Sequence, residues 1–361
     1  MSLWKTDELG KFVTLKRGYD LPQQKRVDGA VPIFSSSGVT GTHKEPMVNA
    51  PGVITGRYGT IGEVFFSKEP FWPLNTTLYV ENFHGNDERF IYYFLKSLKW
   101  EKFTSASAVP GINRNTVHKE IVEIPDLESQ RKIAAVLSTI DDKIDINQRI
   151  NDNLEQQAKA LYEEMFLNTP DKNMTSGTLS DIATITMGQS PNGNSYNESS
   201  VGEVFYQGRA EFGFRFPTRR LFTTEPKRMA EAGDILLSVR APVGDLNVAY
   251  EECCIGRGLG AIHSKAGKNS FLLYTMYALR PQLDVFNGEG TVFGSINRDA
   301  LNSMPLDIPS AERIAQFEAT VHPMDELIRT NYEEICRLES LRDSLLPKLM
   351  SGEIDVSNIQ L

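Results

Sequence analysis

The amino-acid sequence resembles itself, and the two copies lie about 184 residues apart at their clearest matches. Ile112-Asn113-Arg114 in the first half corresponds to Ile296-Asn297-Arg298 in the second half. Ile124-Pro125 corresponds in the same way to Ile308-Pro309. A duplication of this length predicts two similar domains, each with its own core, rather than one larger domain.

Strand-like runs fill most of each half and are separated by Gly, Pro and Asn residues. The run from Leu9 to Gly18 aligns with the run from Leu179 to Gly188, and apolar residues alternate in both. In the middle of each half, the pattern aligns Arg57 with Arg240. These features predict a strand-rich domain of mixed α+β class in each half.

A long helical pattern follows each Ile-Pro pair. Apolar residues recur there at steps of three and four, which is the spacing of a coiled-coil seam. The predicted seam consists of Ile140, Ile144, Asn147, Asn151, Leu154, Leu161 and Met165 in the first helix, and of Ile328, Asn331, Ile335, Leu338, Leu345 and Leu349 in the second. Two equivalent stripes favour pairing of the helices with each other; the alternative is that each helix packs only on its own domain.

Polar and proline residues interrupt this seam. Asn147 and Asn331 occupy equivalent seam positions, where an amide lowers stability but fixes the register of the pairing. Pro323 predicts that the second helix begins or kinks there, after a short helix over residues 312–320, and Pro347 predicts a bend. Several apolar residues lie off the seam and are expected to contact either partner helices or their own domains: Ile133, Val136, Ile146, Ile150, Phe166, Leu341 and Leu346.

The composition narrows the possible classes of protein but neither supports nor excludes binding to DNA. The net charge is −9 at pH 7, and the acidic surplus lies in the two helical segments, so the two longer segments can still carry local basic faces. The three cysteines form no disulfide framework or metal-binding spacing, and the five histidines are scattered. No apolar run approaches the roughly 18 residues of a membrane span, and no signal sequence begins the chain. We therefore expect a cytoplasmic protein without a metal.

Sequence motifs for catalysis are weak. There is no P-loop and no nucleophile elbow, and the glycine loop at Gly256-Arg257-Gly258 lacks the helix and acidic residue of a cofactor site. Asp141-Asp142-Lys143 imitates a nuclease motif but falls on the predicted seam helix. We therefore expect a chain that is not an enzyme and binds no cofactor. An autonomous nuclease or methyltransferase remains an alternative, and it would be active without partners.

The order of these features resembles the DNA specificity subunit of type I restriction-modification systems. The resemblance covers nearly the whole chain and rests on the duplicated Ile-Pro helix starts, on Ala160–Phe166 and Ser344–Ile354 at the helix ends, and on Gly233–Gly244 and Ile255–Leu259. It implies two target recognition domains, each reading one half of a split site in double-stranded DNA. It also implies two antiparallel helices that hold these domains apart and dock two methyltransferase subunits and the restriction subunits.

The resulting domain scheme has four parts. We expect an N-terminal target recognition domain over residues 1–125, a first spacer helix over 126–168, a C-terminal target recognition domain over 169–309 and a second spacer helix over 310–361. The helix from Leu137 to Met165 would be about 42 Å long, close to one turn of B-DNA. This length predicts a bipartite site with an unspecified middle of roughly five to eight base pairs.

Basic and small polar residues in the two domains are candidates for DNA contact. They are Lys16, Arg17, Lys25, Arg26, Ser36, Ser37, Lys44, Arg57 and Tyr58 in the first domain, and Arg209, Arg215, Arg219, Arg220, Lys227, Arg240 and Arg257 in the second. We assign Arg114 and Arg298, next to the Ile-Pro junctions, to structural roles. If these loops are only solvated surface, the chain would be a coiled-coil scaffold; a DNA-binding protein that acts without a restriction partner is a further alternative.

Overall fold

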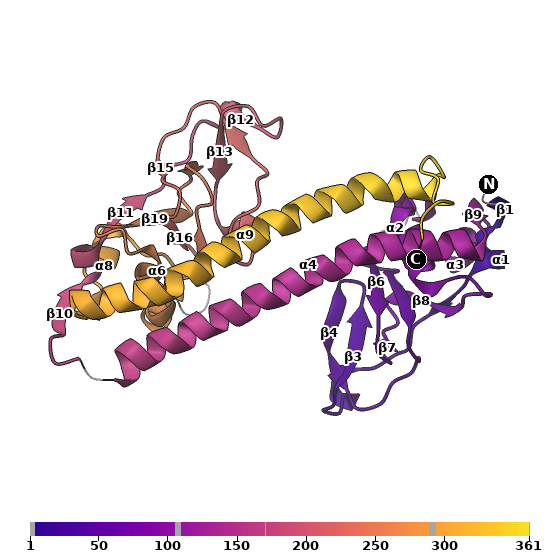
Figure 1. Cartoon of the computed structure of the whole chain (residues 1–361), viewed down its shortest axis with the longest axis horizontal. Coiled ribbons are helices and arrows are strands. Elements are labelled where there is room, and N and C mark those ends of the chain that lie inside the picture. Colours follow the sequence, from indigo (N-terminus) through magenta and orange to yellow (C-terminus); the bar gives the residue numbers. More distant parts are fainter. Residues whose placement is uncertain (1–3, 105–109, 170, 289–293, 361) are drawn as a thin grey trace. The chain divides into compact units, whose positions relative to one another are not determined.

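The computed structural model describes residues 4–104, 110–169, 171–288 and 294–360. Contacts divide the chain into two compact units. The first comprises Met1–Ile146 together with Glu334–Leu361, and the second comprises Asn147–Glu333. Two long helices, α4 (Leu127–Tyr162) and α9 (Ala311–Met350), each contribute one stretch to each unit (Figure 1). The first unit therefore combines two separate segments of the sequence, whereas the second is one continuous segment that begins in α4 and ends in α9.

The first unit contains three small sheets. A four-stranded antiparallel sheet has the order β2-β8-β5-β6, a three-stranded sheet has the order β4-β3-β7, and β1 pairs with β9. The strands are β1 (Trp4–Glu8), β2 (Thr14–Arg17), β3 (Val31–Ser35), β4 (Gly38–His43), β5 (Gly52–Gly56), β6 (Val64–Ser67), β7 (Trp72–Pro73), β8 (Thr77–Asn82) and β9 (Ile121–Pro125). The short helices are α1 (Leu9–Phe12), η1 (Gln23–Lys25), α2 (Glu88–Ser97), η2 (Trp100–Phe103) and α3 (Arg114–His118).

The core of the first unit joins both ends of the chain. Leu346, Leu349 and Val356 are buried in the same cluster as Ile133 and as Phe90 of α2. The start of α4 is fixed by Asp126, whose carboxylate accepts a hydrogen bond from the Ser129 backbone N–H at 3.0 Å. The C-terminal end of the sequence therefore completes the core of the N-terminal domain.

The second unit repeats this plan. A four-stranded sheet has the order β11-β19-β16-β17, a five-stranded sheet has the order β12-β14-β13-β18-β15, and β10 pairs with β20. The strands are β10 (Thr175–Thr178), β11 (Ala183–Met187), β12 (Tyr196–Asn197), β13 (Glu203–Tyr206), β14 (Phe222–Thr223), β15 (Met229–Ala230), β16 (Ile235–Ser238), β17 (Leu246–Val248), β18 (Cys253–Ile255), β19 (Leu259–Ser264) and β20 (Pro305–Ile308). The helical segments are η3 (Glu163–Asn168), α5 (Leu179–Ile182), η4 (Gly193–Ser195), η5 (Arg209–Glu211), α6 (Asn269–Ala278), α7 (Arg280–Asp284), η6 (Val285–Asn287) and α8 (Arg298–Asn302).

Strand register corrects the alignment of the two halves in mid-domain. Gly56 pairs with Thr77 in the first unit, and Ser238 pairs with Leu259 at the equivalent place in the second. Arg57, which follows Gly56, therefore corresponds to Val239, and the counterpart of Arg240 is Tyr58. The sequence pattern was wrong by one residue here, because glycines and arginines in neighbouring turns can be aligned in more than one way.

In each unit, the two long helices lie side by side and run antiparallel. In the first unit Arg342 forms an ion pair with Asp141 at 3.1 Å, and Ile140, Ile144 and Ile335 form a buried cluster. In the second unit the Asn331 side chain donates a hydrogen bond to the Asn151 side chain at 2.8 Å. The second helix also differs from the sequence prediction, since α9 is one helix through Pro323. Pro323 is exposed while Phe317, Val321 and Ile328 are fully buried, so packing on both sides of the proline holds the helix together.

No helix among the described residues is long and apolar enough to cross a membrane.

Candidate nucleic-acid interface

Arg215 is not available to DNA, contrary to the sequence prediction. Its side chain is only 3% exposed and forms ion pairs with Asp325 at 2.6 Å and with Glu155 at 3.1 Å. Its guanidinium also donates to the Tyr274 hydroxyl at 3.2 Å. Burial lowers the pKa of Arg215, but the surrounding acidic and phenolic groups raise it above its ordinary value, so the cation is held as a structural tie between the C-terminal domain and both long helices.

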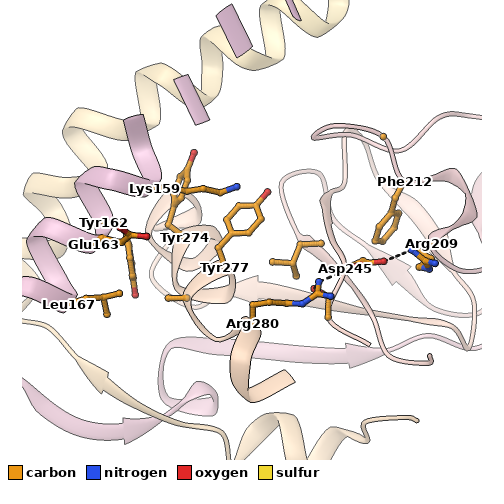
Figure 2. A pocket seen from close by; sticks show the side chains of 14 residues that line it. Lys159, Tyr162, Glu163, Leu167, Arg209, Phe212, Asp245, Tyr274, Tyr277 and Arg280 are labelled. Atoms are coloured by element: carbon orange, nitrogen blue, oxygen red, sulfur yellow. Dashed lines mark hydrogen bonds and ion pairs between the residues drawn. The ribbon is translucent and has the colours of Figure 1, made fainter. Parts of the chain in front are cut away.

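Other arginines of the same loop region are paired with carboxylates. Arg209 binds Asp245, which also binds Arg280 at 3.0 Å (Figure 2). Arg219 binds Glu251, and Arg220 binds Glu211 and Glu198. These pairs neutralise much of the basic run between Arg209 and Arg228, whereas Lys227 is exposed and has no ion-pair partner among the described residues.

A hollow of about 570 Å³ lies beside Arg209 and Arg280 in the second unit, and Figure 2 shows the side chains that line it. Tyr162, Tyr274 and Tyr277 line it from α4 and α6, and the Lys159 ammonium lies 4.1 Å from the centre of the Tyr277 ring. Its cations are already bound to acidic or aromatic groups of the protein. This hollow is therefore a poor candidate for the main contact with DNA.

Several candidates in the N-terminal domain are also compensated. Lys16 donates to Glu81, and this hydrogen bond is the main cause that raises the pKa of Lys16. Arg17 lies 3.4 Å from Asp20, and Arg26 donates to the Thr40 carbonyl. Further candidates in this domain lie at its surface: Lys25 in η1, Ser36 and Ser37 in the turn between β3 and β4, and Lys44 after β4.

Three arginines of the C-terminal domain line one hollow of about 740 Å³: Arg240, Arg257 and Arg298. Arg240 follows β16, Arg257 lies in the turn before β19, and Arg298 begins α8. Within the part of the chain that the structure describes, no carboxylate lines this hollow and none of the three guanidinium groups has a hydrogen-bond or ion-pair partner. We call these three residues the arginine hollow.

The backbone around the arginine hollow is fixed by strand pairing. Arg240 forms a β-bridge with Ser295, and the Ile296 N–H donates to the Val239 carbonyl at 3.0 Å. Asn297 caps α8 by accepting from the Ala300 N–H at 2.9 Å. Arg298 is exposed, and its guanidinium has no hydrogen-bond or ion-pair partner among the described residues, so the structural role expected from its place beside the Ile-Pro junction gains no support there. The repeated Asn-Arg pair was the sequence signal that marked it.

The equivalent place in the N-terminal domain is also basic. Tyr58 bridges Gly111 there, and the Ile112 N–H donates to the Arg57 carbonyl at 3.0 Å. The Arg57 guanidinium lies 4.6 Å from the centre of the Tyr58 ring and donates to the Ile112 carbonyl. Arg114 is exposed and has no acidic partner among the described residues. Arginine and tyrosine at one edge of a domain can contact phosphates and stack against nucleic-acid groups.

The off-seam residues of the long helices divide into two groups. Ile133, Phe166 and Leu346 are buried in the domain cores, and Val136 packs against one of them. Ile146, Ile150 and Leu341 are exposed, by 51%, 39% and 47% respectively. The predicted seam residues Leu154, Leu161, Met165, Leu338 and Leu345 are half-buried, and the remaining seam residues are buried. Ile146, Ile150 and Leu341 are therefore apolar groups that their own domains leave uncovered, as are Leu127 of α4 and Leu327 of α9.

Among the described residues, no cluster of His, Cys, Asp and Glu side chains could hold a metal ion. Cys253 and Cys254 are buried and free, and Cys336 is exposed and free.

Comparison with known proteins identifies the same family over most of the chain. Residues 1–156 and 171–337 match the family model of the type I restriction modification DNA specificity domain. The type I restriction enzyme MjaX specificity subunit of Methanocaldococcus jannaschii is 30% identical over 78% of this chain and 72% of its own. The HindI specificity subunit of Haemophilus influenzae is 38% identical over 68% of this chain and 71% of its own.

A solved structure shares the fold. The S subunit of a type I restriction-modification system from M. genitalium superposes with a TM-score of 0.61, at 17% identity, over 96% of each chain. Both matched segments of the family model coincide with the duplication, one in each half of the sequence.

Proposed function

Because the chain belongs to the type I restriction-modification DNA specificity family, we propose that it selects a bipartite DNA target, with one half-site read by each domain. The duplication of the domain is the main support for this proposal. The strand order of the four-stranded sheet and the bridge beside Ile112 and Ile296 recur in the two units, so each unit offers an equivalent edge to DNA. Two similar readers on one chain bind two separate half-sites more readily than one continuous sequence.

The spacing of the half-sites is proposed to follow from the helices. A helical stretch from Leu137 to Met165 has a length of about 42 Å, or roughly 12 base pairs of B-DNA. With a few base pairs read at each end, an unspecified middle of roughly five to eight base pairs remains.

The chain is proposed to act without chemistry of its own, as a targeting subunit. Ile146, Ile150 and Leu341 would contact apolar helices of two methyltransferase subunits, which would supply methylation; restriction subunits would supply cleavage. Two exposed isoleucines on α4 and one exposed leucine on α9 support this assignment, since large exposed apolar side chains on otherwise polar helix surfaces can mark contact surfaces.

Methylome sequencing of the host, with and without this chain, tests the proposal. We expect one bipartite methylated motif to disappear from the genome when the chain is deleted and to return on complementation. A motif without an unspecified middle, or methylation that does not depend on the chain, would contradict it. Absence of binding to duplex DNA at low salt would instead favour the scaffold alternative.

A further inference from the structure

We propose that the arginine hollow is a binding site for one phosphate of the DNA backbone, and that Arg298 and its counterpart Arg114 are the element of this site common to both domains. The inference rests on the proposed DNA binding and adds which residues hold the backbone. The inference assigns a role to Arg298. The presence of an arginine there is explained neither by its position beside the Ile-Pro junction nor by its place in α8.

The balance of charge around the hollow points to an anionic ligand. Arg240, Arg257 and Arg298 line it, and no carboxylate among the described residues does so, whereas Arg209, Arg219 and Arg220 of the same domain are each paired with one. Positive charges that line one hollow repel each other, and an anion bound in the hollow would neutralise them. An anion with several acceptor oxygens is therefore the natural ligand.

The number of donors favours a phosphate over a base edge. Each guanidinium can give two parallel N–H donors to a phosphate, and several arginines can share its oxygens. The guanine edge offers two acceptors in the major groove, which one arginine already satisfies. Three arginines with no acid between them exceed what one base can use, so reading of a single base is the weaker explanation.

Comparison of the two domains by strand register supports a shared function of this place. Met187 pairs with Gly260 as Arg17 pairs with Leu78, so Arg17 takes the position of Met187. By the same register, Arg57 takes the position of Val239, and Arg114 that of Arg298. The N-terminal domain therefore also has three arginines here, but only Arg114 shares its position with an arginine of the hollow.

This pattern is expected if the local positive charge serves the backbone, which is the same in every sequence, while the exact placement of the other arginines differs between two readers of different half-sites. A purely structural role would require protein partners, and the guanidinium of Arg298 has none among the described residues.

The test uses the full-length chain and a random-sequence DNA duplex of about 40 base pairs, roughly four turns. Fluorescence anisotropy gives the dissociation constant over a series of salt concentrations for the wild type and for Arg298→Gln. Loss of a phosphate contact should weaken binding about tenfold at low salt. It should also reduce the slope of log K against log salt by about 0.9.

Lys265→Gln is the matched control. Lys265 is exposed and belongs to the same domain, but it follows the opposite end of β19, where its ammonium donates to the Ser180 carbonyl. The Lys265→Gln substitution removes one positive charge at a place outside the hollow. The slope of log K against log salt should therefore stay unchanged. Arg298→Lys should recover most of the slope, because the charge is restored without the planar fork.

The outcomes separate this inference from the proposed function. A wild type that binds no duplex overturns both. A wild type that binds, together with an Arg298→Gln variant of unchanged affinity and slope, overturns the phosphate site alone. A loss confined to duplexes that carry the methylated motif would also overturn it, because that result assigns Arg298 to base reading.

Discussion

At the scale of single residues, the same side chain type serves different purposes in this fold. Arg215 is buried between Glu155 and Asp325, while Arg298 is exposed beside a hollow that no carboxylate of the described residues lines. The sequence places Arg215 in a basic run next to Arg219 and Arg220, and nothing in that run distinguishes the buried arginine from the exposed ones. Only the approach of α4 and α9, which come from distant parts of the chain, reveals the difference.

Replacing Arg215 by Met should destabilise the second unit. The change leaves Glu155 and Asp325 without their shared cation, and breaking a buried ion pair in this way costs about 3–5 kcal/mol. Urea denaturation followed by circular dichroism measures the loss. Arg219→Met is the control, because the pair of Arg219 with Glu251 is exposed and should contribute less than about 1 kcal/mol.

The same cluster should make stability depend on pH. Burial raises the pKa of Glu155, but Lys159, Arg215 and Tyr277 outweigh it and hold that pKa below the ordinary value of 4.5. A carboxyl with a lowered pKa stabilises the fold above that ordinary value, and this contribution is lost as the pH falls through the pKa of the folded state. The acid-induced loss should be smaller in Arg215→Met; an equal loss in both proteins would contradict the assignment.

At the scale of elements, the long helices are the best predicted part of the molecule. Their apolar period, set by local geometry, indicated helices and a seam, and the pairing of Ile140 and Ile144 with Ile335 follows from it. The seam amide of α9, Asn331, bonds to Asn151 rather than to Asn147, because antiparallel packing decides which residues face each other. The one-residue error at Arg57 arose in a turn, where register depends on strand pairing and not on a local period.

The exposed apolar groups of α4 give a prediction for partner docking. Ile146→Asp combined with Ile150→Asp should abolish co-purification with the methyltransferase subunits, because the charges must be desolvated in an apolar contact. Binding of random duplex DNA by the chain alone should stay within about twofold, since both residues lie on α4 and neither is among the candidate DNA contacts. Gln148→Asp combined with Asp152→Asn, on exposed positions of the same helix, controls for general damage. Retained co-purification of the double isoleucine variant would exclude this surface.

At the scale of the whole molecule, each unit depends on segments from both halves of the sequence. The N-terminal core includes Leu346, Leu349 and Val356, and the C-terminal core includes Phe317 and Val321 of α9 together with Ala158 and Tyr162 of α4. Sequence-based boundaries at 125 and 309 separate the long helices from the domains, whereas each compact unit includes one stretch of α4 and one stretch of α9. A repeat reveals that two domains exist, but it carries no information on which distant segment completes each core.

Lengthening both helices separates spacing from recognition. Duplicating residues 140–146 of α4 and residues 335–341 of α9 adds one heptad, about 10 Å, to each helix and preserves the spacing of the seam. The unspecified middle of the methylated motif should lengthen by up to about three base pairs, while the letters of both half-sites stay the same. Methylome sequencing of cells that carry the lengthened chain measures both properties at once. Duplication in α4 alone shifts the two helices out of register and should abolish methylation. Altered half-site letters with an unchanged middle would mean that the helices do not set the distance between the readers.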